Sequence, residues 1–285
     1  MKFGLFGVNL DVLGAEPAAA VKVARAAEEA GWESVWTGEH YALPDPWAEP
    51  SPAEAGRPML DPFVALTNVA AHTSTLLLGT GLTVVPYHNP FVLAKKVASL
   101  DRVSGGRVLF GVGVGYLPQE FAALGVPMEE RGERLREGLD ALEVIWTRRP
   151  ASYLGKFVRF ENVGAEPRPV RVPPLHFGGG VERTFERVVT RGHGWFGFAM
   201  DVAAARRAIE RLRRAEERYE RPAGLGPVEI SVTPDPGMTM DDATVAAFAE
   251  LGVSRLIPLP PQDARRDPDR IVHFVQTVGE RYCRA

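Results

Sequence analysis

The sequence predicts a (β/α)8 barrel, a closed ring of parallel strands surrounded by helices. Short apolar runs alternate along the chain with amphipathic stretches, which is the pattern of repeated βα units rather than of a β-sandwich or a helix bundle. Eight such units can be counted, and the length of 285 residues suits a barrel that typically needs about 250 residues. Because no linker, low-complexity segment or longer repeat interrupts the units, we expect residues 1–285 to form a single domain.

The first half of the chain contains four of the expected strands. They cover residues 3–8, 34–37, 76–85 and 107–114. Helices are expected at residues 17–30, from residue 61 onward, at residues 89–103 and at residues 129–147. Pro17 lies in a first helical turn and Gly31 follows the same helix, which is typical of a helix start and stop. Asp61 and Asn89 each precede a proline, so we expect both to cap a helix N-terminus.

The second half of the chain continues the same alternation after one interruption. Strands are expected at residues 175–178, 194–198, 229–232 and 255–259, and helices at residues 181–191, 203–219, 241–250 and 268–281. Residues 152–174 break the alternation, because two runs of period two flank Gly155-Lys156. This pattern predicts a small hairpin inserted before the fifth strand.

An open, doubly wound sheet is the alternative architecture for βα units. Such a sheet commonly carries GxGxxG after its first strand, where glycines allow a dinucleotide phosphate to approach the backbone. The glycine run at residues 111–115 follows the fourth strand instead and has a different spacing. The closed barrel is therefore favoured.

The composition is that of an ordinary globular protein, with 45% hydrophobic and 24% charged residues. The net charge is -3, and the arginines of residues 206–214 are interleaved with glutamates, so nucleic acid is not an expected partner. The apolar start is too short for a signal peptide or a membrane span, which predicts a cytoplasmic protein. Cys283 is the single cysteine, so an internal disulfide or a cysteine metal site is excluded.

Several catalytic motifs are absent from the sequence. There is no Walker A loop, HExxH or GxSxG, and the six histidines lack metal-ligand spacing, which disfavours metal and serine hydrolases. No lysine lies where a barrel enzyme would form a Schiff base, so an aldolase of that type is not expected.

The active site of a (β/α)8 barrel forms at the C-terminal ends of its strands. The second strand ends in Thr37-Gly38-Glu39-His40, which places an acid and an imidazole at the barrel mouth. A histidine can donate a hydrogen bond or transfer a proton near neutral pH. His40 is thus a candidate for stabilising a reduced flavin or protonating a substrate, and a structural histidine bonded to a loop is the alternative.

Glycines mark the ends of three further strands. These segments are Gly79-Thr80-Gly81, Gly113-Val114-Gly115-Tyr116 and Gly178-Gly179-Gly180. Glycine lets the backbone approach a flat ligand closely, and free N–H groups at the helix start after Gly180 favour a phosphate or another anion. Tight βα turns need glycine too, so each motif also fits a purely structural role.

Motifs that recur in order over nearly the full length establish a family resemblance. They are FGL at 3–5, AEEAGWESVW at 27–36, EH at 39–40, LGTG at 78–81, SGGRV at 104–108, GVGVGY at 111–116, EF at 120–121, PP at 173–174, GG at 178–179 and GWF at 194–196. With these motifs the chain resembles the luciferase-like monooxygenase superfamily, and particularly its branch of F420-dependent oxidoreductases. The resemblance implies a homodimer whose barrels each hold a flavin or deazaflavin ring at the mouth.

The resemblance also implies roles for individual residues. His40 would face the ring and the substrate, and Glu39 would help to fix the ring or orient His40. One ring face would be supported by Gly79, Thr80, Gly81 and Leu82, with a cis peptide between Gly81 and Leu82. The phosphate-bearing tail would be contacted by Gly113, Gly115, Tyr116, Gln119, Gly178, Gly179 and Gly180. Tyr116 departs from the small or acidic residues of some relatives.

The leading functional hypothesis is an oxidoreductase that transfers a hydride between F420 and a small organic substrate. The substrate would lie between the ring and a proline-rich loop at residues 41–60, with His40 as acid or base. FMN is the alternative cofactor, and with oxygen as co-substrate it would make the chain a monooxygenase. A non-catalytic flavin or deazaflavin carrier, and a redox-free barrel enzyme that binds a phosphorylated metabolite at Gly178, are the other classes.

Overall fold

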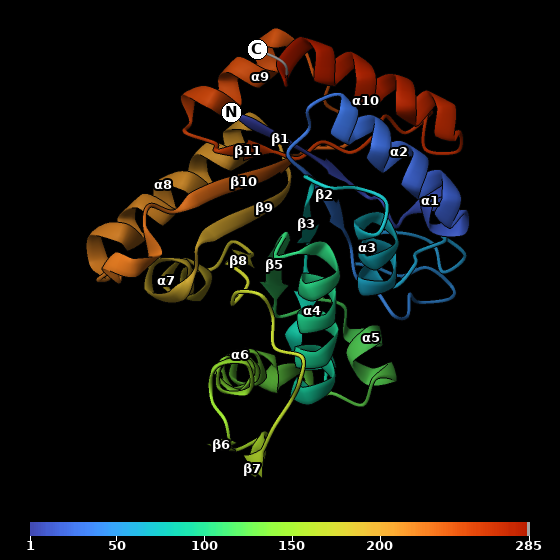
Figure 1. Ribbon diagram of the computed structural model, residues 1–285. Coiled ribbons are helices and arrows are strands. Elements are labelled where there is room, and N and C mark those ends of the chain that lie inside the picture. Colours follow the sequence, from blue (N-terminus) through green and yellow to red (C-terminus); the bar gives the residue numbers. More distant parts are fainter. Residues whose placement is uncertain (284–285) are drawn as a thin grey trace.

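The computed structural model describes residues 1–283, and in this part of the chain eight parallel strands close into a barrel with helices outside it (Figure 1). The barrel strands are β1 (Lys2–Phe6), β2 (Ser34–Thr37), β3 (Leu77–Thr80), β5 (Val108–Gly113), β8 (Leu175–Gly178), β9 (Gly194–Met200), β10 (Glu229–Pro234) and β11 (Arg255–Leu256). Each strand pairs in parallel with the next, and β11 pairs with β1 to close the ring. The predicted (β/α)8 barrel is confirmed.

Helices follow the barrel strands along the chain. They are α1 (Asp11–Ala15), α2 (Pro17–Glu29), α3 (Pro62–Ala70), α4 (Pro90–Ser104), α5 (Pro118–Ala123), α6 (Arg131–Thr147), α7 (Glu182–Arg191), α8 (Val202–Arg218), α9 (Asp242–Glu250) and α10 (Pro268–Tyr282). The side chains of Asp61 and Asn89 accept hydrogen bonds from the amides two and three residues further on, so both predicted N-caps are confirmed. The short helices α1 and α5 were not predicted, because five or six residues are too few to show a helical period.

The expected third strand at residues 76–85 is wrong as a single element. It is divided into β3 and β4 (Thr83–Val84), and the Gly81–Leu82 peptide between them is cis. The cis peptide that the family resemblance implied is thus confirmed. β4 pairs with the end of β5 at Val112 and Gly113, so the divided strand turns toward the barrel mouth.

Two other strands are shorter than predicted, for reasons of backbone chemistry. β1 ends at Phe6 because Gly7 has a φ of 91°, a conformation that glycine adopts easily, and the amides of Gly7 and Val8 both donate to Trp36 O. β11 ends at Leu256, two residues before Pro258, which has no N–H to continue a ladder.

The interior of the barrel is filled by a separate apolar cluster. Its fully or nearly buried members are Phe6, Leu10, Trp36, Leu109, Phe196 and Ile257. Trp36 is fully buried and requires glycine on the neighbouring strand β3, because a Cβ at its register partner Gly79 would lie 2.2 Å from the Trp36 ring. The barrel is therefore a packed core rather than a pore, and ligand space is confined to its ends.

A two-stranded antiparallel pair extends away from the barrel below α6 (Figure 1). It consists of β6 (Ala151–Leu154) and β7 (Arg159–Val163). Glu137 of α6 holds the connecting turn, because its carboxylate accepts hydrogen bonds from the amides of Lys156 at 3.0 Å and Phe157 at 2.8 Å.

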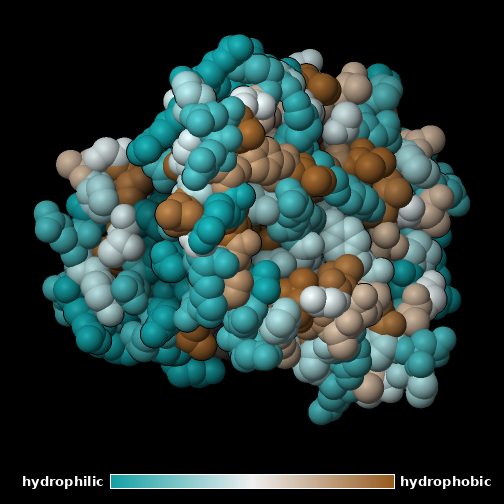
Figure 2. Space-filling model, turned by 90° about the horizontal axis from the view of Figure 1, so that it is seen from below, coloured by the Kyte–Doolittle hydropathy of each residue, from teal (hydrophilic) through white to brown (hydrophobic). Residues whose placement is uncertain are grey.

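The outer surface is mixed in character. On the face shown in Figure 2, hydrophobic residues form small groups that are separated by hydrophilic ones. Scattered exposed apolar residues are normal for a folded protein. Among residues 1–283, no helix combines the length and the apolar character needed to cross a membrane.

Candidate active site

Two buried glutamates organise the barrel mouth. Glu39 follows β2 and is 4% exposed, and Glu120 lies in α5 after β5 and is 0% exposed. Each carboxylate contacts one imidazole, since Glu120 Oε2 lies 2.9 Å from His40 Nδ1 and Glu39 Oε1 lies 3.1 Å from His88 Nε2. The C-terminal end of the barrel thus carries two imidazole–carboxylate pairs.

The pair of His40 and Glu120 defines the orientation of the imidazole. With Nδ1–H donated to the carboxylate, Nε2 is the ring nitrogen that remains for other partners, and Tyr116 Oη lies 3.4 Å from it. The Glu120 carboxylate also accepts hydrogen bonds from the amides of Tyr41 and Ala42 and from Tyr87 Oη. These contacts hold Glu120 so firmly that it can act as a rigid support for His40.

The same contacts set the ionisation of the mouth. Burial on its own would raise the pKa of Glu120, but the hydrogen bond and charge of His40 and the two backbone amides outweigh it, and the pKa is lowered. Burial and the Glu120 charge raise the pKa values of Tyr87 and Tyr116. Near neutral pH, Glu120 is a carboxylate and both tyrosines are hydroxyl donors.

Glu39 is expected to help fix the ring or to orient His40. Within residues 1–283, hydrogen bonds join Glu39 to Tyr41 Oη, to His88 and to the Val84 amide, and none joins it to His40. Glu39 instead fixes β4, since Val84 N donates to it at 2.6 Å.

The predicted ring-supporting residues are used largely within the protein. The Thr80 hydroxyl donates to Gly111 O at 2.7 Å, and Gly79 makes room for Trp36. Gly81 follows Thr80 with its amide bonded to Thr37 O at 2.7 Å, which ties the cis peptide to the strand that carries His40. The structure therefore places residues 79–82 next to the end of β2, three residues before His40.

Two of the glycines that are expected to contact the cofactor tail pack against Leu82. A Cβ at Gly178 would lie 2.0 Å from Leu82 Cδ1, and one at Gly113 would lie 3.1 Å from the same atom. Gly115 has a φ of 79° and would carry its Cβ 2.8 Å from Val84. Packing inside the mouth thus favours glycine at Gly178, and the positive φ adds to that preference at Gly115, while at Gly113 a Cβ would need only a small shift of Leu82.

The other residues that are expected to contact the cofactor tail are exposed to solvent. Tyr116, Gln119, Gly179 and Gly180 are exposed, and no described atom lies within 4 Å of a Cβ built at Gly180. Gly179 has a φ of 118° and lies three residues before the start of α7 at Glu182. These four positions can contact a ligand without rearrangement of the mouth.

Exposed aromatic side chains lie in the segments that follow β2 and β5 and in the second half of β9. Tyr41, Trp47, Tyr116 and Phe198 are each between 43% and 48% exposed, although they are large and apolar. Phe198 stands over Phe6, with ring centroids 5.1 Å apart. Exposed aromatic surface beside a buried charged pair is typical of a binding site for a flat organic molecule. Within the described part of the chain, no cluster of three or more acidic, histidine or cysteine side chains could hold a metal ion.

Sequence reasoning missed three residues of this mouth. Glu120, Tyr87 and His88 join the network, although only Glu120 was part of a recurring family motif. The sequence carries no signal for their pairing, because Glu120 and His40 are 80 residues apart.

Fold and site together define the class: an α/β-barrel enzyme with an imidazole–carboxylate pair and an aromatic binding surface at the C-terminal ends of its strands. The model of the luciferase-like monooxygenase family matches residues 1–268, and the chain belongs to this family.

Known relatives span most of the chain. An uncharacterised protein of Mycobacterium bovis is 34% identical over 269 residues, which are 90% of this chain and 91% of the relative. An F420-dependent hydroxymycolic acid dehydrogenase of Mycobacterium tuberculosis is 29% identical over 206 residues, which are 71% of this chain and 55% of that protein. The crystal structure of the monooxygenase RslO1 from Streptomyces bottropensis has a TM-score of 0.70 and 25% identity, and the match covers 97% of this chain and 80% of that one.

Proposed function

We propose that this protein transfers a hydride between the deazaflavin coenzyme F420 and a small organic substrate, with His40 as the acid or base. The observation that carries the proposal is the pair of His40 and Glu120 beside exposed aromatic side chains at the barrel mouth. The similarity to an F420-dependent dehydrogenase supports the choice of coenzyme.

The residues of the mouth fit a flat ring system. Tyr116 and Phe198 present aromatic surface to solvent, and the backbone at Gly81 is bonded to Thr37 at the end of β2, the strand that His40 follows. Gly179 and Gly180 leave the start of α7 open, which suits the negatively charged tail of such a coenzyme. When bound, F420 would supply the two-electron hydride chemistry, and the protein would supply position and protons.

The proton step belongs to His40. Glu120 holds Nδ1, so a proton that the substrate gains or loses would pass through Nε2. Tyr116 Oη is near enough to donate to Nε2 and to adjust the position of the imidazole. Glu39 would act at a distance, by fixing the backbone of β4 and thereby the cis peptide before it. We also propose, from the family resemblance, a cytoplasmic homodimer.

An FMN-dependent monooxygenase is the second candidate, since the family is described as luciferase-like monooxygenases and RslO1 is a monooxygenase. The two cofactors share a flat tricyclic ring and a phosphate-bearing tail, so the same mouth fits both. A carrier without catalysis would need the glycine turns but not the imidazole–carboxylate pair.

A binding titration tests the proposal directly. The purified chain, freed of small molecules, is titrated in parallel with F420 and with FMN, and cofactor fluorescence is followed. Tight binding of F420 with weak binding of FMN is the expected result. The reverse preference would favour the monooxygenase, and failure of both cofactors to bind would overturn the redox function.

A further inference from the structure

Both ring nitrogens of His40 are contacted by one short segment, which runs from Tyr116 to Glu120. Glu120 Oε2 lies 2.9 Å from His40 Nδ1, and Tyr116 Oη lies 3.4 Å from His40 Nε2. The His40 and Tyr116 rings are nearly perpendicular, with an angle of 87° and centroids 5.8 Å apart. A carboxylate, an imidazole and a phenol thus form a continuous chain of polar contacts.

The turn after β5 brings Tyr116 to His40. β5 ends at Gly113 and α5 begins at Pro118, so Tyr116 lies in the short connection between them. Gly115 has a φ of 79°, a conformation that glycine adopts easily. A Cβ at Gly115 would lie 2.8 Å from Val84 and 2.9 Å from Phe121, so a larger residue would disturb this turn. The local sequence therefore fixes the residue that carries the phenol.

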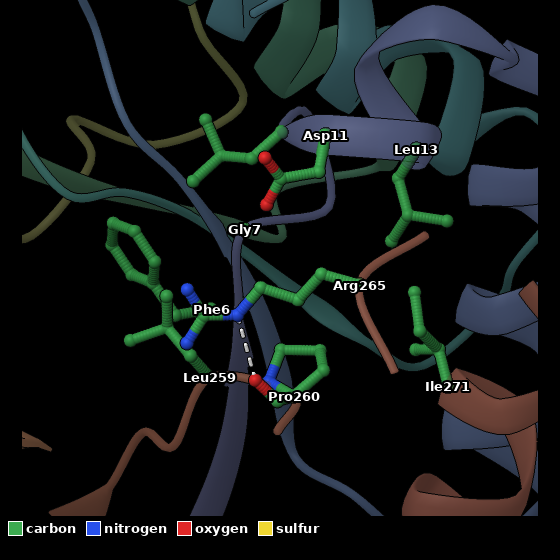
Figure 3. Close-up of a pocket in the computed structure, with 9 residues that line it drawn as sticks. Phe6, Gly7, Asp11, Leu13, Leu259, Pro260, Arg265 and Ile271 are labelled. Atoms are coloured by element: carbon green, nitrogen blue, oxygen red, sulfur yellow. Dashed lines mark hydrogen bonds between the residues drawn. The ribbon is translucent and has the colours of Figure 1, made fainter. Parts of the chain in front are cut away.

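Tyr116 is the member of the chain that solvent reaches most easily. It is 48% exposed, whereas the side chain of His40 is 14% exposed and that of Glu120 is 1% exposed. The hollow near the end of β1, which Phe6 and Gly7 help to line, has free space for about one water molecule (Figure 3). It is too small for a substrate, so a substrate that enters the mouth from solvent meets Tyr116 before His40.

The ionisation of these groups suits the transfer of a proton. Burial, and next the Glu120 charge, raises the pKa of Tyr116, so the phenol keeps its proton near neutral pH. A phenol has one proton to donate and lone pairs that accept. Tyr116 can therefore donate to His40 Nε2 and at the same time accept a hydrogen bond from a substrate hydroxyl.

We propose that Tyr116 is a catalytic residue that relays a proton between a substrate oxygen and His40, and that the substrate is an alcohol or the corresponding carbonyl compound. This inference rests on the proposed function. It differs from direct contact of the substrate with Nε2, because such a contact would have to displace the Tyr116 hydroxyl.

The proposed step balances in atoms and electrons. When an alcohol is oxidised, its C–H bond breaks and the hydrogen leaves with both bonding electrons to the deazaflavin coenzyme, the hydride acceptor. The substrate hydroxyl proton passes to Tyr116 Oη, the proton of the phenol passes to His40 Nε2, and the C=O bond forms. The Glu120 carboxylate stabilises the resulting imidazolium through Nδ1–H. Reduction of the carbonyl compound follows the reverse course.

Nitrogen NMR of the coenzyme-free full chain tests the contact between Tyr116 and His40. The histidines are isotope-labelled, and the His40 signals are assigned by their loss in His40→Asn. At alkaline pH, where imidazoles are neutral, Tyr116→Phe should shift the Nε2 signal of His40 toward that of an unbonded nitrogen and leave its Nδ1 signal in place. An unchanged Nε2 signal would overturn the relay.

A second tyrosine provides the matched control. Tyr282 lies at the end of α10, and its hydroxyl donates to Asp242 Oδ1 at 2.8 Å. Tyr282→Phe also removes one hydrogen-bonded phenol hydroxyl, but it should change neither the His40 signals nor kcat. Both variants keep the aromatic ring, and thermal unfolding checks that both retain the fold.

Turnover tests the proton transfer. 2-Propanol, cyclohexanol and 1-phenylethanol are supplied with the coenzyme that the binding titration selects, and its reduction is followed by absorbance. Tyr116→Phe should lower kcat roughly 10²-fold, the lower end for loss of a proton-transferring group, with a smaller change in KM. In mixtures of light and heavy water, the single-turnover rate of the unmodified chain should fall along a curve, because two protons move. The rate of Tyr116→Phe should fall along a straight line.

The possible results distinguish this proposal from the proposed function. If the alcohols are oxidised but Tyr116→Phe retains kcat and the curve, the relay is overturned and the redox function stands. If a coenzyme binds and the unmodified chain oxidises none of the three alcohols, the proposed substrate class is wrong. If neither coenzyme binds, the redox function fails and the relay fails with it.

Discussion

The two ends of the barrel both carry buried charges, but they use them differently. At the N-terminal end, Arg255 is 1% exposed and bonds to Glu33 Oε1 at 2.9 Å, to Glu229 Oε2 at 3.2 Å and to Ser231 Oγ at 2.9 Å. At the C-terminal end, Glu120 fixes one nitrogen of His40 and leaves the other toward the mouth. At the N-terminal end, which we call the closed end, the buried charges are paired with one another. At the C-terminal end, the open end, the second ring nitrogen of His40 is directed to the mouth.

The difference shows why burial alone does not mark a functional site. Burial would lower the pKa of Arg255, but Glu33 and Glu229 outweigh it and raise the pKa, so the group is a permanent cation with fixed partners. Such a cluster serves stability, as is usual for the N-terminal face of a (β/α)8 barrel. The useful signal for function is a buried charge that positions a second, partly free group.

The comparison predicts the largest effect for the imidazole at the mouth. His40→Ala should lower kcat by roughly 10²- to 10⁴-fold, the range for loss of a general acid or base. Steady-state kinetics with the cofactor selected by the binding titration measures this. His72→Ala, at an exposed histidine bonded to Asn68 O, should leave kcat unchanged. Unaltered turnover in His40→Ala would remove His40 from the mechanism.

At the closed end, the expected loss is in stability rather than turnover. Arg255→Leu strands Glu33 and Glu229 and should lower the free energy of unfolding by about 3 kcal/mol, the lower end for breaking a buried ion pair, because both glutamates can reach water. Lys2→Met removes an exposed partner of the same Glu33, at 3.0 Å, and should change stability by less than about 1 kcal/mol. Urea denaturation compares the two variants. Equal losses of unfolding free energy would contradict the contrast between the buried and the exposed partner of Glu33.

Glu120 is the support for His40, so its replacement should have a smaller effect than removal of the imidazole. Glu120→Gln keeps the size of the side chain but removes the charge, and we expect kcat to fall roughly ten- to hundredfold, between no effect and the loss of the general base. The acid limb of the pH profile should also move. A change in KM alone, with kcat and the pH profile intact, would argue against this positioning role.

The close packing of Leu82 against Gly178 allows a test of one glycine that is expected to contact the cofactor tail. Gly178→Ala forces Leu82 to move and should destabilise the fold by about 1–2 kcal/mol, as overpacking does, and it should weaken cofactor binding. Leu82→Ala combined with Gly178→Ala should recover much of the stability. If the double variant regains stability but not cofactor affinity, Gly178 or Leu82 contacts the cofactor directly.

The smallest effect is a pH dependence that originates at the closed end. Burial, and then the positive charge of Arg255, lowers the pKa of His176 to about 3. In the unfolded chain the histidine pKa is about 6.5, so between the two pKa values the unfolded chain binds more protons than the folded chain. The contribution of His176 to stability is therefore fully present above pH ~6.5 and is lost as the pH falls toward the folded pKa.

From pH 7 to pH 5.5 this group alone should lower the free energy of unfolding by about 1 kcal/mol. His176→Gln should flatten that part of the profile in chemical denaturation at several pH values. An unchanged slope in the variant would assign the dependence to other groups.

Much of the fold could be predicted from local patterns. The bounds of β2 and β8, the two N-caps and the order of the strands all follow from apolar periods and capping chemistry that span a few residues. The division of β3 from β4 was missed as a strand boundary, because Gly81 and Leu82 lie inside a continuous apolar run. Only the family resemblance indicated the cis peptide there.

The candidate site was predicted in part. His40 and Glu39 were placed correctly at the mouth by the rule that strand ends form the active site. The partner of His40 was not, because Glu120 lies 80 residues away in α5 and reaches it only after the barrel closes. The glycines were found as a group, but their reasons differ, since Gly79 faces Trp36, Gly178 faces Leu82 and Gly180 faces solvent.

By itself the sequence determined the alternation of strands and helices, the residues at each strand end and the family, because these depend on periodicity, capping and ordered motifs within short segments. Only the tertiary structure decided which charges meet: Glu33 with Arg255 across 222 residues, and Glu120 with His40 across 80. The physical reason is that side-chain pairing depends on distances in space, which are set once the ring of strands closes.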